Sequence, residues 1–270
     1  MKTITVFEKG VIPFPEIIEQ PVMWGPLKNP SNADNYKAIT DKETGKLFSI
    51  VSRHYKLIRH EEAIDQIENA INKQSDLGKV YTIITEFFND GGRMRRTYRF
   101  IDISNEIKPG DWVNPELHLY NSYDVTWPFT VLLGAFRFVC TNGLVVGRKF
   151  LHMRKRHVYE LSNVNLEEEV STALKRFELQ TKKWQQWAKK PLTKERYTRV
   201  MEFMKFGIKA REEIEQRLKQ EAKGFHQDDF PIITKWIFFN IITWYITHRA
   251  VSLNHRVEME QRLRRAITNY

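Results

Sequence analysis

Cysteine is almost absent from this chain of 270 residues, which contains Cys140 alone. A single cysteine can form neither a disulfide within the chain nor a multi-cysteine zinc site. Because Cys140 lies within an apolar run, we expect a buried free thiol. Apolar residues make up 41% of the chain, so we predict a fold held by a hydrophobic core rather than by cross-links.

The motifs of several large enzyme classes are also absent. The sequence has no G-x-x-x-x-G-K-[ST] nucleotide-binding loop and no G-x-G-x-x-G dinucleotide-binding loop. It lacks both the G-x-S-x-G turn of hydrolases and the H-E-x-x-H zinc motif. His248 and His255 lie seven residues apart, but no carboxylate cluster accompanies them. We therefore predict a protein with no catalytic residues, no metal and no cofactor.

No stretch of the sequence is long enough to span a membrane. The best candidate, residues 232–246, is interrupted by Lys235 and Asn240. It is shorter than the roughly 20 apolar residues that a bilayer requires, so we expect a buried helix there. The N-terminal apolar run is too short for a signal peptide. These features predict a cytoplasmic protein without a membrane partner.

Acidic residues are scarce where basic ones gather. The net charge is +10, and residues 125–159 contain six Lys or Arg and no Asp or Glu. Such an excess favours a polyanionic partner, with nucleic acid ahead of an anionic membrane surface. The alternative is a surface that is basic but binds nothing.

The spacing of apolar, turn and capping residues predicts an α+β protein in three parts. Residues 1–45 contain five prolines between positions 13 and 30 and should form an extended arm with one strand at most. Residues 46–163 should form an antiparallel sheet of four to five strands preceded by a helix over 60–71. Residues 164–270 should be helical, with Asn165 and Thr193 as N-caps.

Turn signals set the expected strands of the sheet. Asn-Asp-Gly-Gly at 89–92 is typical of a hairpin turn, because these residues accept positive φ. The expected strands of the sheet are 80–88, 93–103, 117–123, 130–139 and 144–150, and a further strand over 47–52 comes before the helix.

One face of the strand over 93–103 carries three arginines, Arg93, Arg95 and Arg99, at a spacing of about 7 Å. Single-stranded nucleic acid is held by cations along its phosphates and by flat side chains beneath its bases. We therefore predict that these arginines, together with basic residues in and after the last strands, contact phosphates, and that two aromatic residues stack on bases. The predicted nucleic-acid-binding residues are Arg93, Arg95, Arg99, Arg137, Arg148, Lys149, Arg154, Lys155, Arg156, Tyr98 and Trp127.

Three segments resemble the signature of the DUF932 family of phage and plasmid proteins. LHLYNSYD at 117–124 and LGAFRFVCTNGLVV at 133–146 are similar to the family's Asn-Ser-His-Asp-like strand and its Phe-Arg-x-x-Cys-x-Asn-Gly-Leu-Val turn. Residues 50–58 resemble its Ser-x-x-Tyr segment. Tyr123 stands where the family commonly has His. The motif residues, which we expect to shape turns and loops, are Asn121, Asp124, Cys140, Asn142 and Gly143.

The resemblance implies a protein of a mobile element, acting in replication, recombination or defence evasion in a bacterial host. The element order is also similar to that of Rad52-like single-strand annealing proteins, which need no ATP. We therefore expect a non-enzymatic, oligomeric protein, a ring or filament, that binds and anneals single-stranded DNA. One alternative is a metal-dependent nuclease using Asp111, Glu116 and His118. Another is an interaction protein that blocks a host defence factor.

Overall fold

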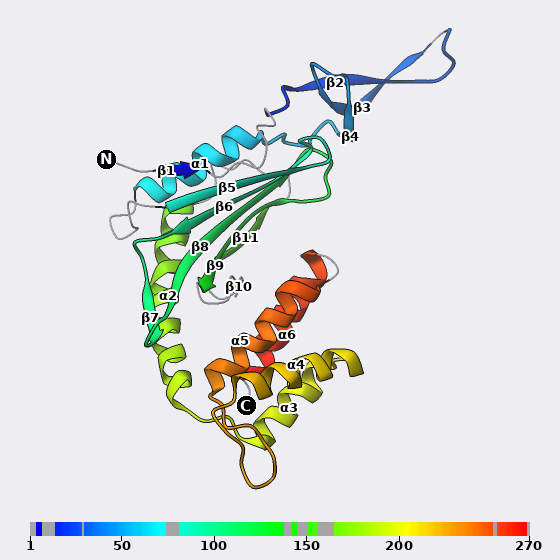
Figure 1. Ribbon diagram of the computed structural model, residues 1–270. Helices are drawn as coiled ribbons and strands as arrows, with labels where there is room; N and C mark the ends of the chain where they lie inside the picture. The colour runs from blue at the N-terminus through cyan, green and yellow to red at the C-terminus, as the bar shows by residue number, and fades with distance from the viewer. Residues whose placement is uncertain are drawn as a thin grey trace. The chain divides into compact units, whose positions relative to one another are not determined.

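The computed structural model confirms the α+β class, with six helices and eleven strands in its described part (Figure 1). Contacts divide the chain into two compact units, which are treated separately below. The first contains residues 1–102, 116–132 and 151–172, and the second contains 103–115, 133–150 and 173–270. The structure describes residues 4–6, 14–28, 30–73, 81–137, 142–144, 151–155, 165–250 and 253–268.

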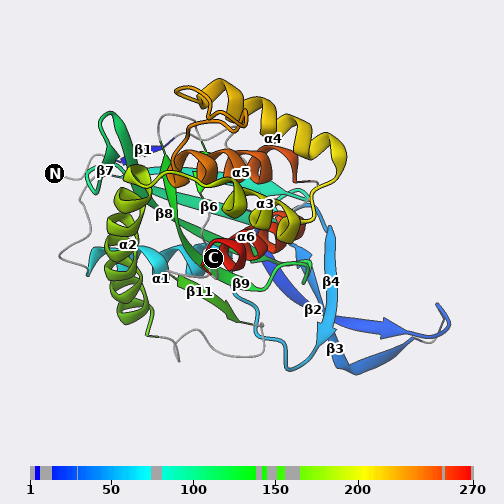
Figure 2. The ribbon, with the colours of Figure 1, turned by 90° about the horizontal axis from the view of Figure 1, so that it is seen from below.

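The N-terminal part of the first unit forms a small sheet, although we expected one strand at most. β2 (Ile17–Trp24), β3 (Ser31–Asp41) and β4 (Leu47–Ser52) pair antiparallel in the order β2-β3-β4, and β2 and β3 form a long hairpin (Figure 2). Pro21 lies within β2, next to an irregularity in its pairing with β3. Because β2 is an edge strand, the amide hydrogen that proline lacks is not needed for a second ladder. Pro21 is therefore compatible with its place in β2.

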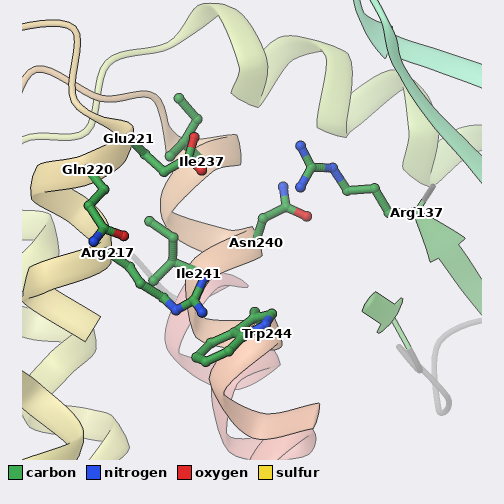
Figure 3. Close-up of a pocket in the computed structure, with 8 residues that line it drawn as sticks. All are labelled: Arg137, Arg217, Gln220, Glu221, Ile237, Asn240, Ile241 and Trp244. Atoms are coloured by element: carbon green, nitrogen blue, oxygen red, sulfur yellow. The ribbon is translucent and has the colours of Figure 1, made fainter. Parts of the chain in front are cut away.

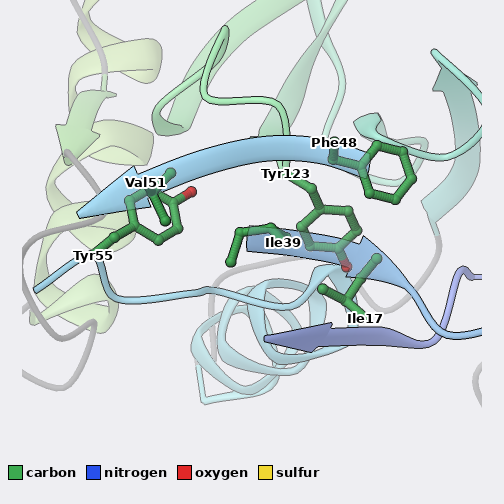
Figure 4. Close-up of a cluster of buried hydrophobic side chains, with 6 residues drawn as sticks. All are labelled: Ile17, Ile39, Phe48, Val51, Tyr55 and Tyr123. Carbon is green, nitrogen blue, oxygen red and sulfur yellow. The ribbon is translucent and has the colours of Figure 1, made fainter. Parts of the chain in front are cut away.

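A hydrophobic cluster joins this small sheet to Tyr123 within the first unit (Figure 4). The Tyr123 ring stacks on His60 with a centroid distance of 4.0 Å. Its hydroxyl accepts a hydrogen bond of 2.8 Å from the backbone N–H of His60, at the start of α1 (His60–Asn72). Burial raises the pKa of Tyr123, so the phenol stays neutral. The cluster consists of Ile17, Ile39, Phe48, Val51, Tyr55 and Tyr123.

The larger sheet has the order β1-β5-β6-β8-β9-β10 in the described part of the chain. β7 pairs with β8, and β11 pairs with β9. The expected hairpin at 89–92 is present, with positive φ at Asn89, Asp90 and Gly91. α1 is amphipathic as expected and buries Ala63, Ile64, Ile67, Ala70 and Ile71. The strands are β1 (Ile4–Val6), β5 (Tyr81–Phe88), β6 (Arg93–Phe100), β7 (Asn105–Lys108), β8 (Asp111–Ser122), β9 (Phe129–Arg137), β10 (Asn142–Leu144) and β11 (Leu151–Lys155).

The C-terminal region is helical, as expected, with both predicted caps in place. Asn165 Oδ1 accepts from Glu168 N at 3.2 Å, and Thr193 caps the next helix by accepting from Arg196 N at 3.3 Å. The helical segment after Thr193 is divided into two helices, because Lys205 adopts a left-handed conformation with φ 53°. The helices are α2 (Leu166–Lys189), α3 (Lys194–Met204), α4 (Ile208–Glu221), α5 (Lys235–Arg249) and α6 (Leu253–Thr268).

α5 belongs to the second unit and buries most of its length, from Trp236 to Thr243 and again at Ile246. Trp236 and Phe239 on α5 pack against Trp184 on α2, with ring centroids 5.4 and 6.2 Å from that indole. Trp187 also packs on Phe239, so the paired tryptophans of α2 serve packing. Within the described ranges, no helix combines the length and the apolar composition that crossing a bilayer requires.

Candidate nucleic-acid interface

The three arginines predicted to bind phosphates do share one face of β6, but each is paired with a carboxylate of the first unit. Arg93 Nε lies 2.5 Å from Asp124 Oδ2, and Arg95 forms a two-point ion pair with Glu86. Arg99 donates to Glu116 Oε1 from Nη2 at 2.9 Å. The side chains are only partly exposed. Their charges are thus balanced within the unit, so this face of β6 does not offer the free cations that the predicted phosphate contacts would need.

Arg137 is also placed differently from the expectation, since it is a buried structural residue of the second unit. It is 7% exposed and forms a two-point ion pair with Asp111, with distances of 2.6 and 2.7 Å. Trp236 Nε1 donates to the same carboxylate at 2.7 Å. The apolar neighbours that made β9 recognisable as a strand also place this arginine in the interior, where its charge is balanced by Asp111 rather than by a phosphate.

The two aromatic residues predicted to stack on bases differ in exposure. Tyr98 is fully buried and donates to Glu68 at 3.1 Å, so the expectation that it stacks on a base is wrong for this structure. Side chains alternate along a strand, so Tyr98 lies on the same face of β6 as the buried Met94 and Phe100. Trp127 is half-buried, packs edge-on against Phe88 and Tyr120, and has Arg93 over its ring.

The motif residues Asn121 and Asp124 form hydrogen bonds that connect separate elements of the first unit. Asn121 Nδ2 donates to Ile58 O at 2.9 Å and lies 3.0 Å from His60 Nδ1. Asp124 accepts from Thr126 N, Asn89 Nδ2 and Arg93 Nε. Burial alone would raise the pKa of Asp124, but the hydrogen bonds from Thr126, Arg93 and Asn89 lower it. These two side chains therefore hold the start of α1 and the loop after β8 in place.

The other predicted residues lie in or near the part of the chain that is not described. Asn142 and Gly143, expected in a tight turn, instead belong to strand β10, where Asn142 pairs with Arg137 and Gly143 with Phe136. Arg154 and Lys155 lie in β11. Cys140, Arg148, Lys149 and Arg156 lie outside the described residues.

A buried cluster around Glu116 includes two of the residues considered for a nuclease. Glu116 is 2% exposed, and its carboxylate lies between Arg99 and His118, whose Nε2 is 3.3 Å from Glu116 Oε2. Burial by itself raises the pKa of Glu116, but His118 and Arg99 outweigh it and lower the value to about 2. In the described part of the chain, no three His, Cys, Asp or Glu residues are grouped to hold a metal ion. Asp111 and Glu116 are each engaged by a buried or half-buried arginine instead.

The net charge is distributed very unevenly along the chain. Residues 1–172 contain 22 Lys or Arg and 22 Asp or Glu, whereas residues 173–270 contain 21 and 11. The whole excess of ten positive charges therefore lies in the C-terminal part, which belongs to the second unit. The sequence analysis weighted the local basic run after β9 and so did not predict this asymmetry in net charge. A separate charge count for each predicted part of the chain would have revealed it.

Three cations of the second unit, one just after α2, one in α3 and one at the start of α5, lie close enough for two of them to act on the third. The chain after α2 pairs with the chain before α5, through hydrogen bonds from Leu192 N to Ile233 O at 2.9 Å and from Lys235 N to Lys190 O at 3.0 Å. Burial lowers the pKa of Lys235, and repulsion from Arg196 and Lys190 lowers it further. In the described ranges no carboxylate forms an ion pair with any of Lys190, Arg196 and Lys235, which we call the basic cluster.

Comparison with known proteins gives a family but no described function. The family model for "Domain of unknown function (DUF932)" matches residues 47–268. A short segment is 38% identical over 68 residues to UPF0380 protein YafZ of Escherichia coli strain K12, and this covers 25% of each chain. The match thus spans a quarter of that relative's length. No solved structure gives a significant match. Because the family model covers most of the chain, the protein belongs to the DUF932 family.

Proposed function

We propose that this protein binds single-stranded nucleic acid through its helical C-terminal region, without ATP and without cleaving the strand. The observation that carries the proposal is the location of the entire net charge of +10 in residues 173–270. Such a concentration attracts phosphate backbones and releases their counterions. This moves the proposed interface from the β6 arginines, which are neutralised, to the surface of the second unit.

The basic cluster supports the proposal at the level of individual residues. Lys190 is exposed, and Arg196 and Lys235 are half-buried. Like charges held this close destabilise the protein unless an anion or solvent screens them. A phosphate at this position would be stabilised by all three side chains. The cluster is therefore the first place where we expect the strand to bind.

Annealing and assembly into a ring or filament extend this proposal. They follow from the similarity in element order to Rad52-like proteins, which is an analogy at the level of the fold. Annealing by this route needs an extended strand with accessible bases and no nucleotide hydrolysis. The sequence contains no G-x-x-x-x-G-K-[ST] nucleotide-binding loop, which agrees with a process that does not hydrolyse nucleotides.

The proposal predicts a steep dependence of binding on salt. Contact with three phosphates of a single strand gives a loss of affinity of roughly 20-fold between 50 and 200 mM salt. The variant Lys190→Glu/Lys235→Glu should bind at least about tenfold more weakly than wild type, with a salt slope shallower by about 1.4. Glutamate is tolerated at the first position of a helix such as α5. Fluorescence anisotropy with a labelled 20-nucleotide strand measures both quantities.

The matched control is Lys28→Glu/Lys42→Glu, which changes the net charge equally but lies outside residues 173–270. It should retain most of the wild-type affinity. Affinity that does not respond to salt, or an equal loss in both double variants, would refute the proposed interface. No binding at all would favour the interaction protein instead.

The arrangement of the candidate nuclease residues does not support the nuclease alternative. The carboxylates of Asp111 and Glu116 are both engaged by arginines. Incubation of labelled DNA with the protein and magnesium or manganese should leave the DNA intact, and cleavage by a homogeneous preparation would reverse this conclusion.

A further inference from the structure

A recess of about 420 Å³, counting the part open to solvent, lies in the second unit beside α4 and α5 (Figure 3). The side chains that matter for the argument come from both helices. They are Arg217 and Gln220 of α4, and Ile237, Asn240, Ile241 and Trp244 of α5.

The recess contains a buried hydrogen-bond acceptor without a donor. Asn240 is 4% exposed, and its Nδ2 donates to Trp236 O at 2.7 Å, which fixes the orientation of the amide. In the part of the chain that the structure describes, Asn240 Oδ1 has no hydrogen-bond partner. Figure 3 shows the amide directed toward Arg137. A buried carbonyl left unpaired costs about 1–3 kcal/mol, so a ligand N–H at this point would recover that free energy.

The charge around the recess selects a neutral donor. Arg137 lines the recess, but its positive charge is balanced by the carboxylate of Asp111. An anionic group placed next to Asn240 would face the lone pairs of Oδ1. A neutral amino or imino group avoids this repulsion and supplies the missing hydrogen bond.

The walls of the recess favour a flat ligand. Ile237 and Ile241 provide apolar surface, and the guanidinium of Arg217 lies 3.1 Å from the centroid of the Trp244 ring. Planar guanidinium and indole groups stacked in this way offer a flat polar surface beside a flat apolar one. Unpaired bases are recognised by such planes together with hydrogen bonds to their edges.

We propose that this recess binds one unpaired nucleobase of the bound strand, with an exocyclic amino group donating to Asn240 Oδ1. The inference rests on the proposed function and adds to it a preference among bases. Cytosine and adenine carry such an amino group, whereas uracil and thymine present a carbonyl oxygen at the corresponding position. That oxygen would face Asn240 Oδ1, and because both atoms are acceptors, no hydrogen bond would form between them.

The test compares oligodeoxycytidine with oligodeoxyuridine of 15 nucleotides, whose bases differ at the amino group in question. Wild type should bind the cytosine strand about three- to tenfold more tightly, the range that one hydrogen bond gives. In Asn240→Leu the ratio of the two affinities should fall to about one, with affinity for the uracil strand unchanged. Gln216→Leu also removes a side-chain amide, but from the exposed surface of α4. It should therefore keep the wild-type ratio of the two affinities.

The outcomes separate this inference from the proposed function. Equal, salt-sensitive binding of both strands by wild type overturns the base pocket and leaves the phosphate interface intact. Failure to bind either strand overturns both. If circular dichroism shows that Asn240→Leu is unfolded, Gln220→Trp replaces it, because Gln220 is exposed at the recess. A folded Gln220→Trp protein that keeps the cytosine preference overturns the pocket, and one that loses it supports the pocket.

Discussion

Replacing Asp111 with alanine is expected to lower the free energy of unfolding by about 3–5 kcal/mol. The carboxylate is 1% exposed and accepts from both Arg137 and Trp236. Its removal leaves a buried guanidinium without a counter-charge and an indole N–H without an acceptor, and both are costly in an apolar interior. Urea unfolding followed by circular dichroism measures the loss.

A double variant provides the control for this prediction. Asp111→Leu/Arg137→Met removes both charges and fills the space with apolar atoms, so it should regain the part of the stability that the unpaired guanidinium costs in Asp111→Ala, while the indole N–H of Trp236 still lacks its acceptor. Asp111→Asn, which keeps the acceptor for Trp236 but not the charge, should fall between wild type and the alanine variant. Stability of Asp111→Ala within about 1 kcal/mol of wild type would contradict the role given to this ion pair.

Acid is expected to unfold the protein partly through Glu116. The pKa of this carboxyl is lowered from 4.5 to about 2 in the folded state, so the folded protein binds its proton less tightly than the unfolded chain does. Its contribution, about 3 kcal/mol, is therefore complete above about pH 4.5. It is lost as the pH falls toward about 2. Urea unfolding at a series of pH values should show this decline.

The variant Glu116→Gln isolates that contribution. It should be less stable than wild type near neutral pH, and its stability should fall less steeply between pH 4.5 and 2. Glu86→Gln is the matched control, because Glu86 also pairs with an arginine on the same face of β6 but is about one-third exposed. Its loss should stay below about 1 kcal/mol. Parallel pH profiles for wild type and Glu116→Gln would show that Glu116 does not titrate as described.

Periodic and capping signals predicted much of the fold. α1, the hairpin at 89–92 and the caps at Asn165 and Thr193 follow from local sequence, because each depends on residues close together in the chain. The β2–β3 hairpin was not predicted, since prolines normally argue against strands and only the neighbouring strand shows that β2 lies at an edge. Likewise, nothing local distinguishes Lys205, whose left-handed conformation ends α3, from the lysines within helices.

The candidate site was harder to predict because its parts are distant in sequence. The alternation of β6 correctly placed three arginines on one face, but their carboxylates come from β5, β8 and the loop after β8. Lys190 and Lys235 are 45 residues apart, and they meet only because short backbone segments pair beside α2 and α5. Charge balance depends on such pairings. A local count of basic residues therefore overestimated the unpaired positive charge on β6 and underestimated that of the C-terminal helices.

Pro21 in β2 has a consequence for how the protein behaves at high concentration. The hairpin bears exposed Met23 and Trp24, and an unpaired strand edge beside apolar side chains is a template on which further chains can add. A missing amide hydrogen, together with the irregular pairing between Pro21 and Met23, interrupts the row of groups that such an addition would need. We therefore expect Pro21, the residue that argued against a strand in the sequence, to limit fibril growth from this edge.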